Sequence, residues 1–212
     1  MYLINETYFT KSRYIPNIQS NISDDLITLT EFIDSESRLL LKNVLGYLNF
    51  KDLDQYIDVN GDLVGATQKW IDFVNGVEYT YNNEIYKWNG LLFQEGAQKE
   101  SLIADYVFCK WLENEQSQMS GVGEVVINAQ NAINVSGIER HVRVWNDFVM
   151  KYQGNYSYNV QPTYWFKNGI RVTDWTSNYN GYVSMLEYLT HKEADFEPIP
   201  FKQYETINQF GL

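Results

Sequence analysis

The stretch Leu102-Ile-Ala-Asp-Tyr-Val-Phe-Cys-Lys-Trp-Leu112 decides the fold of this chain. Its residues are apolar at nearly every position, so a helix formed here has hardly any polar face. Such a helix is stable only when other elements surround it. We therefore expect a helix over about 98–117 that acts as a central pillar, with the rest of the chain packed on it.

A second helix is expected over about 136–152, antiparallel to the first. Its apolar residues recur at steps of three and four, the spacing of one helical stripe: Ile138, Val142, Trp145, Val149 and Tyr152. Ser136 and Glu139 have the spacing of a capping box, which favours a helix start. The glycine-rich segment Ser117–Val126 is expected to form a loop between the two helices.

The segments before the pillar predict further helices. Residues 1–22 have no clear period, and acidic residues after Ser23 favour a helix start there. Gly46 indicates either a break in this helix or a close contact with another helix. A short helix is expected over 67–74.

Two hairpins and an arm are expected among the remaining segments. Asn82-Asn83 predicts a hairpin over about 79–88, and Asn168-Gly169 predicts one over about 163–173. A last helix is expected over 182–191. Beyond residue 194, Pro198 and Pro200 argue against a helix, and alternating aromatic residues indicate an extended arm that needs a surface to lie on.

These elements predict a mainly α fold with small β elements. It consists of an antiparallel helix bundle around the central pair, one or two β-hairpins and an extended C-terminal arm. We expect one domain over 1–212, with an irregular N-terminal segment (1–22), a helical core (23–154), a hairpin and loop insertion (155–180) and the arm (194–212).

Charge and composition exclude several classes of protein. The chain has 212 residues and a formal net charge of −11, which does not favour binding to nucleic acid phosphates. No apolar run is long enough to span a membrane, and the N-terminus lacks the pattern of a signal peptide. Cys109 is the only cysteine, so no intrachain disulfide is possible, and we expect its thiol in the core of a protein made in a reducing cytoplasm.

Residue patterns for metal or cofactor chemistry are weak. With two histidines and one cysteine, no zinc-ligand spacing occurs, and no phosphate-binding or nucleophile-elbow motif is present. The acidic turn after Asp58 fails the spacing of a calcium loop, so a solvated turn is expected, and Gly121-Val-Gly123 is interpreted as a tight loop. Paired carboxylates such as Glu113 and Glu115 leave a carbohydrate-processing or carbohydrate-binding module as an alternative.

The order of aromatic and glycine motifs along residues 24–212 resembles the small head-to-tail connector proteins of tailed bacteriophages. It is most similar to those of phages infecting Bacteroides-type hosts, including the crAss-like phages. The motifs that carry the resemblance are soft patterns of aromatics, glycines and helix order: Leu29-x3-Ile33, Leu45-Gly-Tyr-Leu48, Trp70–Tyr79, Lys87-Trp-Asn-Gly-Leu91, Tyr106–Leu112, Met119-Ser-Gly-Val-Gly123, a helix around Arg140–Phe148, and Asn208-Gln-Phe-Gly-Leu212.

The resemblance implies a structural virion protein. Such proteins form a ring, often of twelve copies, beneath the portal, where they join head to tail and line part of the DNA conduit; they have no enzymatic activity and no cofactor. The implied partners are copies of the chain, the portal and other neck or tail proteins, with DNA passing through unbound. The implied location is the head–tail junction of the virion. Another virion component, such as a tail-tube or stopper protein, is the alternative.

Subunit contacts are expected from the loop Ser117–Val126 or from the C-terminal arm. The candidate interface residues are Met119, Val122, Phe196, Phe201, Tyr204 and Phe210. No catalytic, cofactor-binding or metal-ligating residue is expected. Deletion of Glu197–Leu212 is predicted to leave the monomer folded but to block its entry into the ring.

Overall fold

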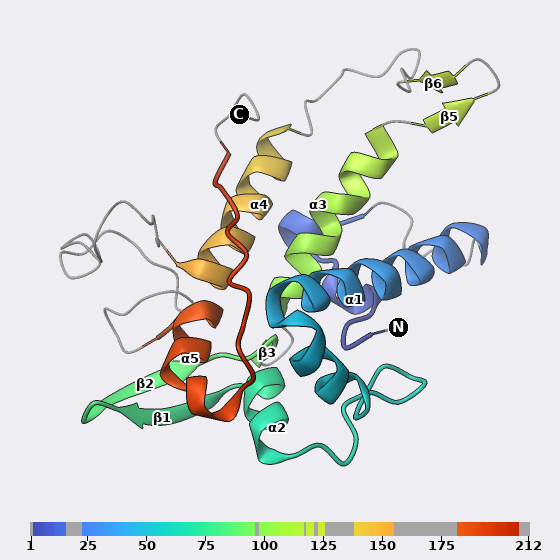
Figure 1. Ribbon diagram of the computed structural model, residues 1–212. Coiled ribbons are helices and arrows are strands. Elements are labelled where there is room, and N and C mark those ends of the chain that lie inside the picture. The colour runs from blue at the N-terminus through green and yellow to red at the C-terminus, as the bar shows by residue number, and fades with distance from the viewer. Residues whose placement is uncertain are drawn as a thin grey trace.

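The computed structural model describes residues 2–15, 23–95, 98–116, 118–120, 123–125, 138–154 and 182–207. These residues form a mainly α structure with small antiparallel β elements and one hydrophobic core (Figure 1). Core side chains come from the first described residues, such as Tyr2, and from the last, such as Tyr204. None of the described helices is both long and apolar enough to cross a lipid bilayer.

Helix α3 (Leu102–Gln116) is the pillar that the sequence predicts. Every residue from Leu102 to Cys109 is buried, so the helix is enclosed around its circumference. It begins at Leu102 rather than near residue 98 because Ser101 caps it: the Ser101 Oγ accepts the Ile103 N–H at 3.1 Å. The residues just before it instead form strand β4 (Gln98–Ser101), paired with β3 (Leu92–Glu95), a hairpin that the sequence analysis did not predict.

Helix α4 (Ile138–Gln153) packs on α3 and runs in the opposite direction. Asp105 near the start of α3 pairs with Lys151 near the end of α4, and Glu113 near the end of α3 faces His141 near the start of α4. The expected second helix is thus confirmed, although Ser136 of the expected capping box lies outside the described residues.

The buried face of α4 differs from the predicted stripe. Val144 and Phe148 are buried together with Val149 and Tyr152, whereas Val142 and Trp145 are half-buried. A second side of α4 is covered by the C-terminal residues: the Trp145 indole N–H donates to the Glu205 carbonyl at 2.8 Å. This contact places Trp145 at the border between two covered faces.

Helix α1 (Ser23–Asp54) crosses α3 and turns sharply at Gly46, where φ is +76° (Figure 1). This positive φ is strained for residues with a Cβ atom. A Cβ atom on Gly46 would also lie 3.1 Å from the Pro200 side chain. The break expected at Gly46 is therefore confirmed, whereas the close contact there is with the extended residue Pro200 rather than with a helix. Helix α2 (Gln68–Asn75) follows, as expected.

The hairpin predicted at Asn82-Asn83 is present as β1 (Val77–Tyr81) and β2 (Glu84–Trp88). Both turn residues have positive φ, 49° and 66°, as a type I′ turn requires. Helix α5 (Met185–His191) then packs near this hairpin through ring contacts of Tyr188 and His191. A third pair, β5 (Gln118–Ser120) with β6 (Gly123–Val125), lies in the segment expected to be a loop, and the hairpin expected over 163–173 lies outside the described residues.

The N-terminal segment is held in the core by a buried charge cluster. It contains the short 3-10 helices η1 (Glu6–Tyr8) and η2 (Lys11–Arg13). The Asp105 carboxylate accepts hydrogen bonds from the Arg13 guanidinium and, at 2.7 Å, from the Lys151 ammonium. All three side chains are buried, and a buried charge is tolerated only when it is paired in this way. Three distant parts of the chain are thereby joined.

Candidate interaction site

The C-terminal residues 197–207, here called the strap, follow the short helix η4 (Glu193–Asp195) and run extended across the molecule along α4 (Figure 1). Three side-chain amides of the helices hold it. Asn49 of α1 pairs with both the N–H and the C=O of Glu197, at 3.0 and 2.8 Å. Gln153 of α4 does the same with Tyr204 at 3.0 and 2.7 Å, and Asn146 with Ile207 at 2.9 and 2.9 Å.

Two further contacts also reach the strap backbone. The Tyr152 hydroxyl donates to the Lys202 carbonyl at 2.7 Å, and Trp145 donates to Glu205 as described above. An amide side chain carries one acceptor and two donor hydrogens, so it can satisfy a main-chain N–H and C=O together, as a neighbouring β-strand would. Helix α4 therefore binds an extended segment largely through its backbone.

One side chain of the strap occupies a closed aromatic socket. The Tyr204 ring lies 5.1–6.4 Å, centroid to centroid, from four rings of α3 and α4, those of Tyr106, Trp145, Phe148 and Tyr152. Burial raises the pKa of Tyr204 to about 12. The Tyr204 hydroxyl has no hydrogen-bond partner among the described residues, so the ring is held by packing against the four rings and by the Lys202 ammonium, which lies 5.1 Å from its centroid.

A group of exposed apolar side chains, here called the kink surface, lies where the strap crosses α1. It consists of Tyr47, Leu48 and Phe201, which are 72%, 57% and 42% exposed. Tyr47 and Leu48 directly follow Gly46, and Phe201 directly follows Pro200, the residue packed against Gly46. Two segments distant in sequence thus present large apolar groups at one place on the surface.

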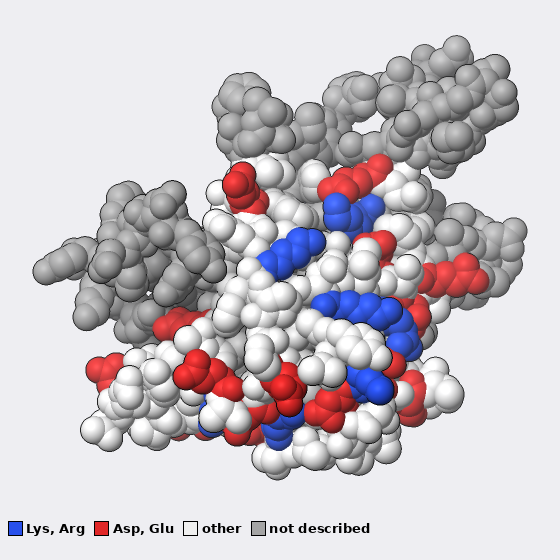
Figure 2. Space-filling model, in the orientation of Figure 1, with Lys and Arg blue, Asp and Glu red and all other residues white. Residues whose placement is uncertain are grey.

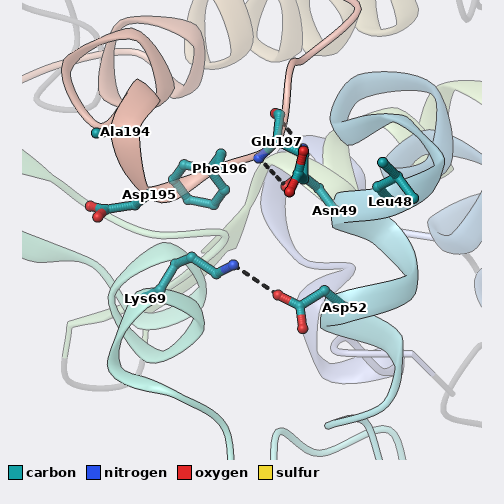
Figure 3. A pocket seen from close by; sticks show the side chains of 8 residues that line it. All are labelled: Leu48, Asn49, Asp52, Lys69, Ala194, Asp195, Phe196 and Glu197. Atoms are coloured by element: carbon teal, nitrogen blue, oxygen red, sulfur yellow. Dashed lines mark hydrogen bonds and ion pairs between the residues drawn. The ribbon is translucent and has the colours of Figure 1, made fainter.

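A cavity of about 350 Å³ lies beside the kink surface, between α1, α2 and the residues before the strap (Figure 3). Within it, the Lys69 ammonium pairs with the Asp52 carboxylate at 2.8 Å, and Asn49 is paired with Glu197. The hydrogen bond from Lys69 lowers the pKa of Asp52. The Trp70 indole N–H donates to the same carboxylate, so the polar groups in the cavity interior are satisfied by one another rather than aimed at a free space.

Charges do not gather into one field on the face that carries the strap. In Figure 2, uncharged residues cover much of this face, a few basic side chains lie near its middle, and acidic and basic side chains are mixed along its lower part. Acidic residues outnumber basic ones in the whole chain, 27 to 16. A surface of this kind lacks the clustered lysines and arginines that bind nucleic acid backbones.

The predicted interface residues differ in burial: some are buried, one is exposed, and others lie outside the described residues. Phe196 is in the core against Trp70 and Phe73, and Tyr204 is in its socket. Both are buried in their own chain in this form, and their role as subunit contacts stays a prediction. Phe201 is exposed. Met119 lies on β5 but its side chain is not among those described, and Val122 and Phe210 lie outside the described residues.

The position of the strap also corrects the prediction for its deletion. The sequence analysis expected that a chain without Glu197–Leu212 folds normally. Removing the strap would instead open the socket of Tyr204 and leave the amides of Asn49, Asn146 and Gln153 without the partners they have in this structure. We therefore expect the truncated chain to be strongly destabilised.

The candidates for metal and catalytic chemistry are engaged in local contacts. The Asp58 carboxylate accepts the N–H groups of Asn60 and Asp62 at 2.9 Å, so it closes its own turn. Glu113 pairs with Lys110 at 2.6 Å, and the side chain of Glu115 is not described. Cys109 is buried, and burial raises the pKa of its thiol, as expected for a core residue. Among the described residues, no group of three or more His, Cys, Asp or Glu could hold a metal ion.

The residues that sequence reasoning missed are the three strap-binding amides. Asn49 and Gln153 are buried although each lies on a helix rich in apolar residues. A polar residue on the buried side of an amphipathic helix needs a hydrogen-bond partner. An amide residue at such a position therefore predicts a partner, but the sequence does not show that this partner is the backbone of a residue about 50 to 150 positions away.

Comparison of the chain with protein-family models, curated proteins and solved structures yields no match.

Proposed function

We propose that this chain is a non-enzymatic structural subunit of a tailed-phage virion, one copy of a ring that joins the portal to the tail. The observation that carries the proposal is the kink surface. Large apolar side chains exposed together indicate a surface that another protein covers. Tyr47 and Leu48 directly follow the kink of α1, and Phe201 directly follows Pro200, which packs on Gly46 at that kink.

The architecture supports a ring subunit in two further ways. A ring repeats one heterologous contact, in which a patch on each copy meets a different patch on the next. A well-packed single core with apolar groups at one edge suits such a contact. The net charge of −11 suits a conduit through which DNA must slide, since it offers no attraction to phosphates. The resemblance to head-to-tail connector proteins points to the same role.

The first test measures self-assembly of the purified full chain by mass photometry and negative-stain electron microscopy. We expect closed rings at high protein concentration. Leu48→Asp should abolish them, because it places a charge in the apolar contact. The matched control is Val59→Asp, since Val59 is an apolar residue that is 96% exposed but lies on the Asp58 turn. A wild-type chain that stays monomeric at all concentrations, or equal assembly of both variants, would contradict the proposal.

The second test locates the chain in purified phage particles by electron microscopy. A ring between portal and tail is the expected position. Density for this chain along the distal tail would instead favour the tail-tube or stopper alternative.

A further inference from the structure

The strap-binding face of α4 can bind any copy of the strap, not only its own. Four side chains hold the strap beyond Phe201: Tyr152, Gln153, Asn146 and Trp145. All four bind main-chain atoms. The one strap side chain with a dedicated seat is Tyr204. The same contacts can therefore form without loss when residues 202–207 come from a second copy of the chain.

The residue where the strap would turn toward a neighbour is strained. Phe201 has φ of +38° although it is neither glycine nor asparagine, and its ring is exposed rather than packed in the core. A bulky residue in this region costs free energy that only the surrounding structure can hold in place. Pro198 and Pro200 stiffen the chain just before it. Short, strained hinges of this kind favour exchange of the segment that follows between identical subunits.

The contacts on the other side of Phe201 explain which part would stay. Asn49 binds Glu197, Pro200 packs on Gly46, and Phe196 lies in the core of its own chain. These contacts anchor the strap up to the hinge. Only Phe201 separates Pro200 from Lys202, whose carbonyl is the first group of the exchanged segment that α4 binds. A step of two extended residues spans roughly 7 Å, so the exchange requires the neighbour's α4 to lie directly beside the kink in α1.

We propose that in the assembled state residues 202–207 of each copy lie on α4 of the neighbouring copy, with Tyr204 in the neighbour's aromatic socket and Phe201 as the hinge. Each copy then donates one strap and accepts another. Such a head-to-tail exchange closes into a ring when the rotation between neighbours permits it. The structure described above is the form in which the strap covers its own subunit, and in which the socket is closed to other copies. This inference rests on the proposed self-assembly.

The test records which subunit each strap lies on. Ile207, a half-buried strap residue whose backbone binds Asn146 of α4, is replaced by a benzophenone amino acid in both ¹⁵N-labelled and unlabelled full-length chain. Equal amounts are mixed, assembled and irradiated. Mass spectrometry then identifies cross-links between residue 207 and peptides of α4. With exchange, about half of the cross-linked pairs in the ring fraction combine one labelled and one unlabelled peptide; monomers from the same mixture should give none.

The outcomes separate this inference from the proposed function. Rings with mixed cross-links support the exchange. Rings in which every cross-link joins peptides of one label overturn it, while self-assembly stands. A chain that forms no ring overturns the proposed function, and the exchange with it.

A pair of hinge variants tests the role of Phe201. Phe201→Gly and Phe201→Ser both remove the exposed ring, but only glycine relieves the positive φ. Relief of the strain favours the form in which the strap stays on its own subunit, so the glycine variant should show about fivefold fewer mixed cross-links than the serine variant. Equal fractions would overturn the assignment of Phe201 as the hinge.

Discussion

At the scale of single residues, Gln153 shows how one side chain fixes a distant segment. Its amide satisfies both main-chain groups of Tyr204 inside the core. Gln153→Ala removes both partners and leaves a buried N–H and C=O unsatisfied, so we expect a loss of roughly 2 kcal/mol in the free energy of unfolding. Urea unfolding of the purified chain measures this. The control is Gln203→Ala on the exposed side of the strap, which should change stability by less than about 0.5 kcal/mol.

Tyr152 of the socket and Tyr204, which occupies it, differ in what their hydroxyls bind. The Tyr152 hydroxyl donates to Lys202, whereas the Tyr204 hydroxyl is buried without a partner among the described residues. Tyr152→Phe should therefore destabilise the chain by about 1 kcal/mol, and Tyr204→Phe should stabilise it or leave it unchanged. Thermal unfolding followed by circular dichroism compares the two. A loss for Tyr204→Phe as large as that for Tyr152→Phe would contradict the assignment.

His191 makes the stability of the chain depend on pH. Its ring stacks on Tyr81 with centroids 3.9 Å apart, its Nδ1 lies 2.8 Å from the Tyr79 hydroxyl, and its Nε2 is 4.0 Å from Glu187. Burial lowers the pKa of His191 below 6.5, so the folded state resists protonation. The unfolded chain takes up the proton first, and the free energy of unfolding falls as the pH drops below 6.5. His141 has a pKa lowered by burial as well and contributes in the same direction.

His191→Phe should separate the contribution of His191 to the pH dependence of stability from that of His141. Phenylalanine keeps the stack on Tyr81 but cannot bond Tyr79, so the variant should be less stable than the natural chain by about 1 kcal/mol at pH 7.5. The gap should narrow at pH 5.5, since the variant no longer carries the protonation penalty. Urea unfolding at both pH values measures the gap, and an equal difference at the two pH values would exclude a titrating role for His191.

At the scale of elements, local sequence signals predicted those parts whose cause is local. The turn Asn82-Asn83 and the helix break at Gly46 were readable from residue type alone, and both are present. The apolar sequence of α3 predicted a buried helix because a helix with almost no polar face is stable only when other elements surround it. Strands β3 and β4 have no such signal: Gln98–Ser101 is polar and pairs antiparallel with Leu92–Glu95. The face of α4 was also missed, because the strap covering it lies 50 residues or more further along the chain.

The type I′ turn offers a test at this scale. Asn83 has φ of +66°, a conformation that glycine adopts at lower cost. Asn83→Gly should raise the free energy of unfolding by roughly 0.5 kcal/mol without altering the fold, since Asn-Gly is the preferred pair for this turn. The control is Thr80→Gly in the middle of β1, where glycine should destabilise the strand by about 1 kcal/mol. Stabilisation by both substitutions would contradict the turn assignment.

At the scale of the whole molecule, the cluster of Arg13, Asp105 and Lys151 ties the N-terminal segment, α3 and α4 together. Asp105→Asn would take the shared carboxylate from Arg13 and from Lys151, which keeps its pair with Glu100 at 3.5 Å. We expect a loss of about 3 kcal/mol, roughly the cost of breaking a buried ion pair. The control is Glu113→Gln, which removes an exposed pair with Lys110 and should cost less than about 1 kcal/mol. Denaturant unfolding compares them, and similar small losses would show that the cluster is dispensable.

The candidate site is formed by segments that are distant in the sequence, so the sequence predicted it only in part. Phe201 was predicted as a contact residue and is exposed; Tyr47 and Leu48 were not singled out, because exposure of an apolar residue next to a helix break depends on what packs around the break. Phe196 and Tyr204 were expected to need a surface to lie on, but the sequence could not show which one, because their sockets are built by helices distant in the sequence.

The placement of Tyr204 has a consequence for synthesis of the chain on the ribosome. Helices α3 and α4 are complete once residue 153 has been made, yet the aromatic socket between them stays open until about fifty more residues have emerged. During that interval the nascent chain exposes the aromatic rings of the socket to solvent, and such a state is prone to aggregation. Slow translation upstream of codon 204, or a bound chaperone, would decide how much of the product survives to be assembled.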